Sequence, residues 1–132
     1  MIWATAMPTV MLVDDTASAR LLLARLLRRD GYTVVCAEDG PDALGQLDAG
    51  VRPDMILLDY MMPGVDGLDV LAEIKSHPET SRTPVVMFTA VADQRVQDRA
   101  TELGASDYVV KAAVEWDDLR LRLRRLAGPT TA

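Results

Sequence analysis

Residues 9–15 read TVMLVDD, a short strand-like run that ends in two aspartates. Similar runs return as MILLD at residues 55–59, VVMFT at 85–89 and YVVK at 108–111. Short apolar runs of this kind predict buried parallel strands. In an open α/β sheet the carboxyl ends of such strands share one edge, and ligands bind there. We therefore expect one shared site at that edge, formed by Asp14, Asp15, Asp59, Thr89 and Lys111.

Strand-like and helix-like segments alternate five times along the chain, which is typical of βαβ units and a parallel sheet. The strands are expected at Thr9–Val13, Thr33–Ala37, Met55–Leu58, Val85–Phe88 and Asp107–Val110. Apolar spacing and turn residues predict helices at Ala17–Arg29, Asp42–Leu47, Leu68–Ser76, Gln94–Leu103 and Leu119–Leu126. The last of these, LRLRLRRL, also alternates like a strand, but acidic residues before it and arginines within it favour a helix.

Composition limits the class of protein. The 132 residues suit one domain, and a net charge of −6 argues against direct nucleic-acid binding. Cys36 is the only cysteine, so no internal disulfide is expected. No apolar run approaches the ~20 residues of a membrane helix, and MIWATAM lacks the features of a secretion signal. We expect a cytoplasmic protein that starts at Met1 or Met7, with an extension at 1–8, the domain at 9–127 and a tail at 128–132.

The side chains expected at the sheet edge suit a divalent cation and a phosphoryl group. Asp14 and Asp15 repel each other when ionised, and a cation between them and Asp59 would relieve that repulsion. A few hard oxygen ligands suit Mg²⁺, whereas no His/Cys cluster favours zinc. Asp59 is then a candidate nucleophile toward phosphorus. Lys111 would neutralise phosphoryl charge, and the Thr89 hydroxyl would donate a hydrogen bond to a phosphoryl oxygen.

Four pieces of the chain, VMLVDD, MILLDYMMPGVDGL, VVMFTA and GASDYVVK, resemble the receiver domain of two-component response regulators in order and separation. The resemblance runs from Thr9 to about Ala127. It implies an α/β, flavodoxin-like fold: a doubly wound, five-stranded parallel sheet in order 2-1-3-4-5, with five helices in three layers. It also implies a stand-alone phospho-accepting signalling module that catalyses only its own phosphorylation and dephosphorylation, and not an enzyme with a separate substrate.

Carried onto the matching positions, the resemblance assigns residue roles. Asp59 would accept a phosphoryl group from a histidine kinase or a histidine phosphotransfer protein. Mg²⁺ would be bound by Asp15, Asp59 and the backbone carbonyl of Met61, with Asp14 acting largely through water. Thr89 and Lys111 would contact the phosphoryl group, and Tyr108 would turn inward as Thr89 moves, which changes the surface offered to an unknown downstream protein. The pocket lining is expected to include Met61, Met62, Ala90 and Val91.

The chain departs from the family pattern at Ala112, where most relatives have a proline after the lysine. A cis bond without proline costs about 3–4 kcal/mol. If the Lys111–Ala112 bond is trans, we expect Lys111 to contact the phosphoryl group less well. Met61 and Val91, beside the pocket, are both apolar and cannot position a water molecule by hydrogen bonding. We therefore predict slow hydrolysis of the phosphoaspartate.

Other interpretations remain open at this point. The chain could be a receiver fragment of a hybrid kinase or of a larger regulator, or an unphosphorylated scaffold, for which Ala112 is the only support. A haloacid-dehalogenase-like phosphatase is least favoured, because Asp14 is followed by Asp15 and Thr16 and the D-x-D pattern is missing. The last helix and the acidic residues before it suggest a weak symmetric dimer through residues 93–126, which would need an apolar centre to be stable.

Overall fold

The computed structural model describes residues 7–127. Most of the expected extension and the whole expected tail therefore lie outside the described residues. The chain order is β1 (Thr9–Val13), α1 (Ala17–Arg29), β2 (Thr33–Ala37), α2 (Gly40–Asp48), β3 (Met55–Leu58), α3 (Gly67–Ser76), β4 (Val85–Thr89), α4 (Gln94–Glu102), β5 (Asp107–Val110), η1 (Lys111–Ala113) and α5 (Trp116–Ala127). All strand pairs are parallel and the order is β2-β1-β3-β4-β5, which confirms the predicted fold.

The helix bounds differ from the predicted ones where capping residues set the start. The Asp39 side chain accepts the Asp42 N–H at 2.8 Å, so α2 begins at Gly40. In α3 the Asp66 side chain accepts the Asp69 N–H at 3.0 Å in the same way. Helix α5 begins at Trp116, three residues before the predicted start, and the ambiguous run LRLRLRRL is helical. The 3₁₀ turn η1 was not predicted.

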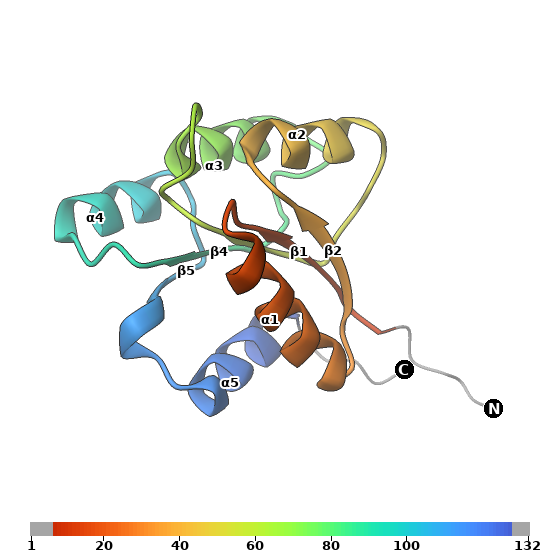
Figure 1. Ribbon diagram of the computed structural model, residues 1–132. Coiled ribbons are helices and arrows are strands. Elements are labelled where there is room, and N and C mark those ends of the chain that lie inside the picture. Colours follow the sequence, from red (N-terminus) through yellow and green to blue (C-terminus); the bar gives the residue numbers. More distant parts are fainter. Residues whose placement is uncertain (1–6, 128–132) are drawn as a thin grey trace.

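Two apolar layers form because successive strand residues point to opposite faces of the sheet. Helices α1 and α5 cover one face and α2, α3 and α4 the other (Figure 1). In β1, for example, Val10 and Leu12 pack toward α1 and α5, whereas Met11 and Val13 pack toward α2 and α3. Every residue of β3 is buried, as expected for the central strand. Within residues 7–127, every helix is too short or too polar to span a bilayer.

The strand register decides which side chains meet at the sheet edge. Val13 of β1 pairs with Leu58 of β3, so the next residues, Asp14 and Asp59, leave the sheet at the same level on adjacent strands. Thr89, the last residue of β4, pairs with Val110, the last residue of β5, so Lys111 lies one residue beyond the end of the sheet. On the opposite edge, helices turn back into strands through glycines with a φ of 103°, namely Gly31, Gly50 and Gly104.

Candidate functional site

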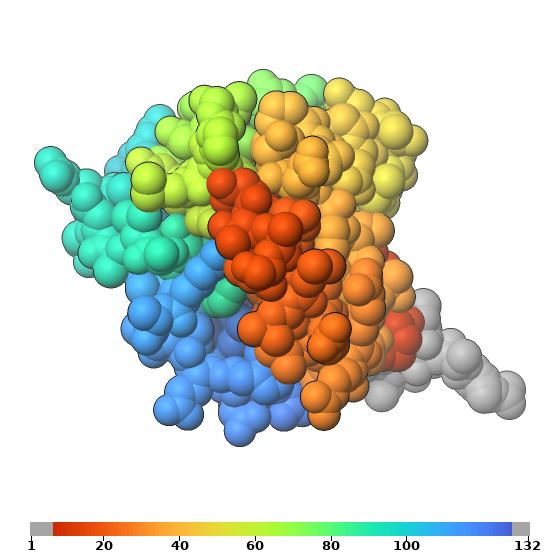
Figure 2. Space-filling view, viewed as in Figure 1, coloured from red at the N-terminus to blue at the C-terminus, as the bar shows by residue number. Residues whose placement is uncertain are grey.

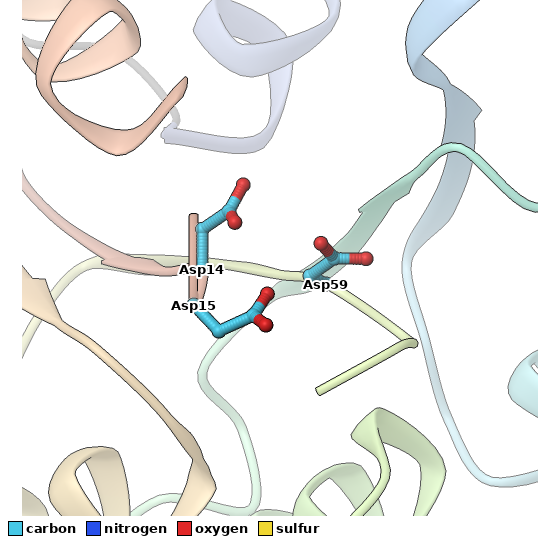
Figure 3. A group of neighbouring side chains, drawn as sticks. All are labelled: Asp14, Asp15 and Asp59. Carbon is cyan, nitrogen blue, oxygen red and sulfur yellow. The ribbon is translucent and has the colours of Figure 1, made fainter. Parts of the chain in front are cut away.

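Three carboxylates meet at the carboxyl end of the sheet. One oxygen from each of Asp14, Asp15 and Asp59 lies within 4.8 Å of the others. Figure 3 shows the side chains of Asp14 and Asp15 leaving the end of β1 in different directions, with Asp15 reaching toward Asp59. Asp14 and Asp59 are buried and Asp15 is exposed. Buried carboxylates this close together need positive charge beside them, and the exposed Asp15 leaves the group open to an ion from solvent.

Asp14 is the carboxylate with the most partners. Its Oδ1 accepts the Thr16 N–H at 2.9 Å, and its Oδ2 accepts from Lys111 Nζ at 2.7 Å. The Arg20 guanidinium donates to the Asp14 backbone carbonyl at 2.6 Å. Both carboxylate oxygens are therefore already engaged, which suits an indirect role toward a metal. Arg20 was not predicted as part of the site, and nothing in its position on α1 indicates that contact.

Asp59 lies at the floor of the site with 8% of its surface exposed. Its Oδ1 accepts the Met61 N–H and its Oδ2 accepts from Lys111 Nζ, both at 3.3 Å. The loop after Asp59 is held close to the start of α3, because the Gly67 N–H donates to the Tyr60 carbonyl at 2.7 Å. A Cβ on Gly67 would lie 2.2 Å from the Asp59 carbonyl oxygen, so this approach requires glycine.

Lys111 sits between two of the carboxylates. No peptide bond in residues 7–127 is cis, so the Lys111–Ala112 bond is trans, and the ammonium still pairs with Asp14 and Asp59. Burial alone would lower the pKa of Lys111, but the hydrogen bond to Asp14 and the attraction of Asp59 outweigh it and raise the pKa. The ammonium also lies 5.5 Å from the centre of the Phe88 ring. The substitution of proline by Ala112 therefore leaves a charged lysine in the site.

Thr89 and Tyr108 are linked through the backbone of Val91. Thr89 is fully buried at the end of β4, and its Oγ1 accepts the Val91 N–H at 3.3 Å. Tyr108 has 9% of its surface exposed, and its hydroxyl donates to the Val91 carbonyl at 2.6 Å. Burial, followed by the charge of neighbouring Tyr60, raises the pKa of Tyr108. The Tyr108 side chain is therefore buried and bonded to the main chain of the loop that follows β4.

Asp15, Asp59 and Lys111 border a hollow of about 640 Å³. Of the predicted lining residues, Met61, Met62 and Ala90 border it, but Val91 does not. Met61 stands at the mouth with 64% of its surface exposed, and Met62 is buried. Asp66, which was not predicted as part of the site, also lines the hollow. An all-oxygen set of carboxylates fits Mg²⁺ better than zinc, and the space beside it admits a small anion.

Comparison with known proteins gives the family. The model of the response regulator receiver domain matches residues 10–124. The chain belongs to this family. A receiver domain is a signalling module of two-component systems, and the acidic pocket formed by Asp14, Asp15 and Asp59 fits the phosphoacceptor site of such domains.

The relatives include longer regulators and receiver domains of similar size. Regulatory protein AtoC of Escherichia coli (strain K12) is 37% identical over 92% of this chain, which spans 25% of AtoC. The chain spans half or less of the length of the curated relatives it matches. A putative response regulator from Chloroflexus aurantiacus superposes with a TM-score of 0.86 and 31% identity, covering 94% of this chain and 100% of that one. TrrA from Thermotoga maritima, solved in complex with Mg(2+)-BeF, superposes with a TM-score of 0.80 and 32% identity, covering 91% of this chain and 99% of that one.

Proposed function

We propose that Asp59 is the phosphoacceptor of this receiver domain and that its phosphorylation depends on Mg²⁺. The observation that carries the proposal is the position of Asp59: a nearly buried carboxylate at the floor of an open hollow, beside a lysine ammonium and two more carboxylates. Asp15, Asp59 and the Met61 carbonyl would hold the metal, and Asp14 would act through water. The bound ion would neutralise charge on the entering phosphoryl oxygens.

In the proposed transfer a carboxylate oxygen of Asp59 attacks phosphorus of a phosphohistidine. A P–O bond forms, the P–N bond breaks, and its electron pair stays on the imidazole nitrogen. Lys111 already lies 3.3 Å from Asp59 Oδ2, so its ammonium is placed to pair with a phosphoryl oxygen. The partner is a histidine kinase or a histidine phosphotransfer protein. The module has no separate substrate and turns over only its own phosphoryl group.

The proposed switch runs through Thr89 and Tyr108. A dianion on Asp59 would attract the Thr89 hydroxyl and Lys111, and Thr89 carries the Val91 backbone with it through their hydrogen bond. Because the Tyr108 hydroxyl is bonded to the Val91 carbonyl, the ring responds to the same movement. Since the ring is already inward, phosphorylation would stabilise this position and not create it. The surface of α4, β5 and α5 would carry the result to a downstream protein.

Intact-mass spectrometry tests the proposal directly. The chain is incubated with Mg²⁺ and acetyl phosphate, beside Asp59→Asn and the matched control Asp66→Asn. Asp66 borders the same hollow, and asparagine can still cap α3 as Asp66 does. We expect a phosphoryl adduct on the wild type and on Asp66→Asn, and none on Asp59→Asn or without Mg²⁺. An adduct that persists on Asp59→Asn would contradict the assignment. No adduct on any form would favour the scaffold interpretation.

A further inference from the structure

Arg20 ties the start of α1 back to the end of β1. Its backbone N–H donates to the Thr16 carbonyl at 2.9 Å, and its guanidinium Nη1 donates to the Asp14 backbone carbonyl at 2.6 Å. A charged donor makes such a bond stronger than a neutral donor would. The Arg20 side chain is half-buried and takes part in none of the ion pairs found within residues 7–127. The Asp14 carbonyl is therefore the acceptor that holds this guanidinium in place.

Helix α1 begins without the side-chain cap that starts α2, α3 and α4. Each of those three helices follows an aspartate whose side chain accepts a backbone N–H of the first turn. Thr16, which precedes α1, makes no such bond within residues 7–127. The turn between β1 and α1 is held through Asp14 instead, because Asp14 Oδ1 accepts the Thr16 N–H at 2.9 Å and the Asp14 carbonyl accepts from Arg20. The geometry of this turn thus depends on contacts to a residue of the candidate site.

The bond to Arg20 fixes the peptide group that joins Asp14 to Asp15. A peptide group is planar, so the direction of its carbonyl sets the backbone dihedral angles on either side of it. The Asp15 carboxylate is exposed and has no hydrogen bond or ion pair within residues 7–127. The direction in which Asp15 reaches toward Asp59 (Figure 3) therefore depends on the main chain that Arg20 holds.

The turn between β1 and α1 also borders the hollow at the carboxylates. Asp15 and Thr16 line the hollow from this turn, and residues 59–63 line it from the segment after β3. Figure 2 shows the red-orange start of α1 at the surface, beside the yellow-green segment that follows β3. A cation that enters from solvent thus meets a carboxylate whose position is set by this turn.

We propose that Arg20 is a positioning residue of the cation site. By holding the peptide between Asp14 and Asp15, it keeps one oxygen of each of Asp14, Asp15 and Asp59 within 4.8 Å of the others before a cation arrives. A site that is already arranged binds more tightly, because less ordering accompanies binding. The inference rests on the proposed Mg²⁺ dependence, since it concerns the same site.

The charge of Arg20 alone would have the opposite effect on a cation. An arginine side chain is always positively charged, and like charges repel, so a guanidinium beside the carboxylates weakens cation binding. Its removal would strengthen binding if charge dominated and would weaken binding if positioning dominated. Because Arg20 is half-exposed, solvent and salt screen its charge, whereas its hydrogen bond acts directly on the main chain. We expect positioning to dominate.

Isothermal titration calorimetry with Mg²⁺ alone measures the effect, with Arg28→Met as the matched control for Arg20→Met. Arg28 lies on the same helix, and its guanidinium donates to the Val34 carbonyl at 3.2 Å, also across six residues. Val34 pairs with Val10 near the start of β1, at the end of the sheet away from the carboxylates. Methionine has a helix propensity close to that of arginine, so both variants should keep α1 helical.

The three variants should differ in Mg²⁺ affinity and not in the loss of stability alone. We expect Arg20→Met to raise the Kd for Mg²⁺ by about tenfold, and Arg28→Met to leave it unchanged. Arg20→Lys keeps a charged donor and should lie between Arg20→Met and the wild type. Urea unfolding should show a similar loss of stability in the two methionine variants, because each loses one bond from a guanidinium to a main-chain carbonyl.

The rate of phosphorylation by acetyl phosphate gives a second readout. Arg20→Met should raise the Mg²⁺ concentration required for half of the maximal rate. The maximal rate itself should stay within about twofold of the wild type, because saturating Mg²⁺ selects the arrangement that binds it.

Three results would overturn the inference. Unchanged or tighter Mg²⁺ binding in Arg20→Met would leave Arg20 as a neighbouring charge only. An equal loss of Mg²⁺ affinity in Arg28→Met would assign the effect to a general loosening of α1. In both of these cases the Mg²⁺-dependent adduct on Asp59 would still stand. A wild-type chain that binds no Mg²⁺ would overturn the proposed function, and this inference with it.

Discussion

Replacing Gly67 by alanine should disturb the candidate site from a position that touches no ligand. The added Cβ would lie 2.2 Å from the Asp59 carbonyl oxygen and 2.7 Å from the Tyr60 Cα. An ordinary carbon–oxygen contact is about 3.3 Å or longer, so backbone on one side must retreat by about 1 Å. Overpacking of this kind costs about 1–3 kcal/mol. Since Gly67 opens α3, the gain from alanine's helix propensity offsets little of that cost.

Gly45→Ala is the matched control, because it makes the same chemical change inside α2. A Cβ at Gly45 meets nothing within 4 Å. Alanine in a helix interior is favoured over glycine by about 0.5–1 kcal/mol, so this variant should be more stable than the wild type. The two substitutions are therefore expected to change the free energy of unfolding in opposite directions.

Urea unfolding measures both variants, and Mg²⁺ titration of the folded proteins measures the site. We expect a lower unfolding midpoint with an unchanged slope for Gly67→Ala, together with weaker Mg²⁺ binding, because the Asp59 backbone is displaced. Gly45→Ala should bind Mg²⁺ like the wild type. Wild-type stability and Mg²⁺ affinity in Gly67→Ala would refute the reasoning, and so would an equal loss of stability in the control.

Three further outcomes are expected. Tyr108→Phe leaves the Val91 carbonyl without the phenol donor, so the free energy of unfolding in urea should fall by about 1 kcal/mol. An unchanged urea midpoint would mean that the 2.6 Å hydrogen bond contributes nothing to stability. Lys111→Met should destabilise the chain by about 1–3 kcal/mol at neutral pH. The pKa of Lys111 is raised in the folded chain, so the difference in unfolding free energy between wild type and Lys111→Met is fully present below the pKa of an unfolded lysine, about 10.4. The difference should disappear as the pH rises through the pKa of Lys111 in the folded chain. Urea unfolding at a series of pH values checks this. After the phosphoryl donor is removed, the phosphoryl adduct of the wild type should persist. Met61→Asn should shorten the lifetime of the adduct, whereas Met61→Leu should not. A wild-type adduct that is lost as fast as that of the asparagine variant would contradict slow hydrolysis.

The sheet and the positions of its reactive residues could be predicted because strand ends are marked in the sequence. Apolar runs stop at Asp14, Asp59 and Lys111, and parallel register brings such ends to one edge. The five strands follow from the same apolar runs, whereas the helix over residues 119–126 was favoured by the acidic residues before it and the arginines within it. The chemistry of the side chains suggested roles for Asp59, Lys111 and Thr89, whereas the switch role of Tyr108 came from the family resemblance, and all of these roles stand as proposals.

Other features depend on backbone details that no short pattern encodes. The contact from Arg20 to the Asp14 carbonyl depends on how the loop between β1 and α1 turns. The position of Lys111 after a trans bond depends on η1, which was not predicted. The inward ring of Tyr108 rests on a hydrogen bond to the Val91 main chain, and a sequence shows the donor but not the location of the carbonyl. Contacts between side chain and backbone across loops were therefore the main omission.

The glycine turns on the edge opposite the carboxylates make this chain suitable for labelling. Gly50 joins α2 to β3 with a φ of 103°, and no atom lies within 4 Å of a Cβ built there. A flexible insertion at this turn would leave the sheet at the end remote from Asp59 and would cross neither the hollow nor α1. A fluorophore or an affinity tag placed at this turn would therefore report on the chain without standing in the path of a phosphoryl donor.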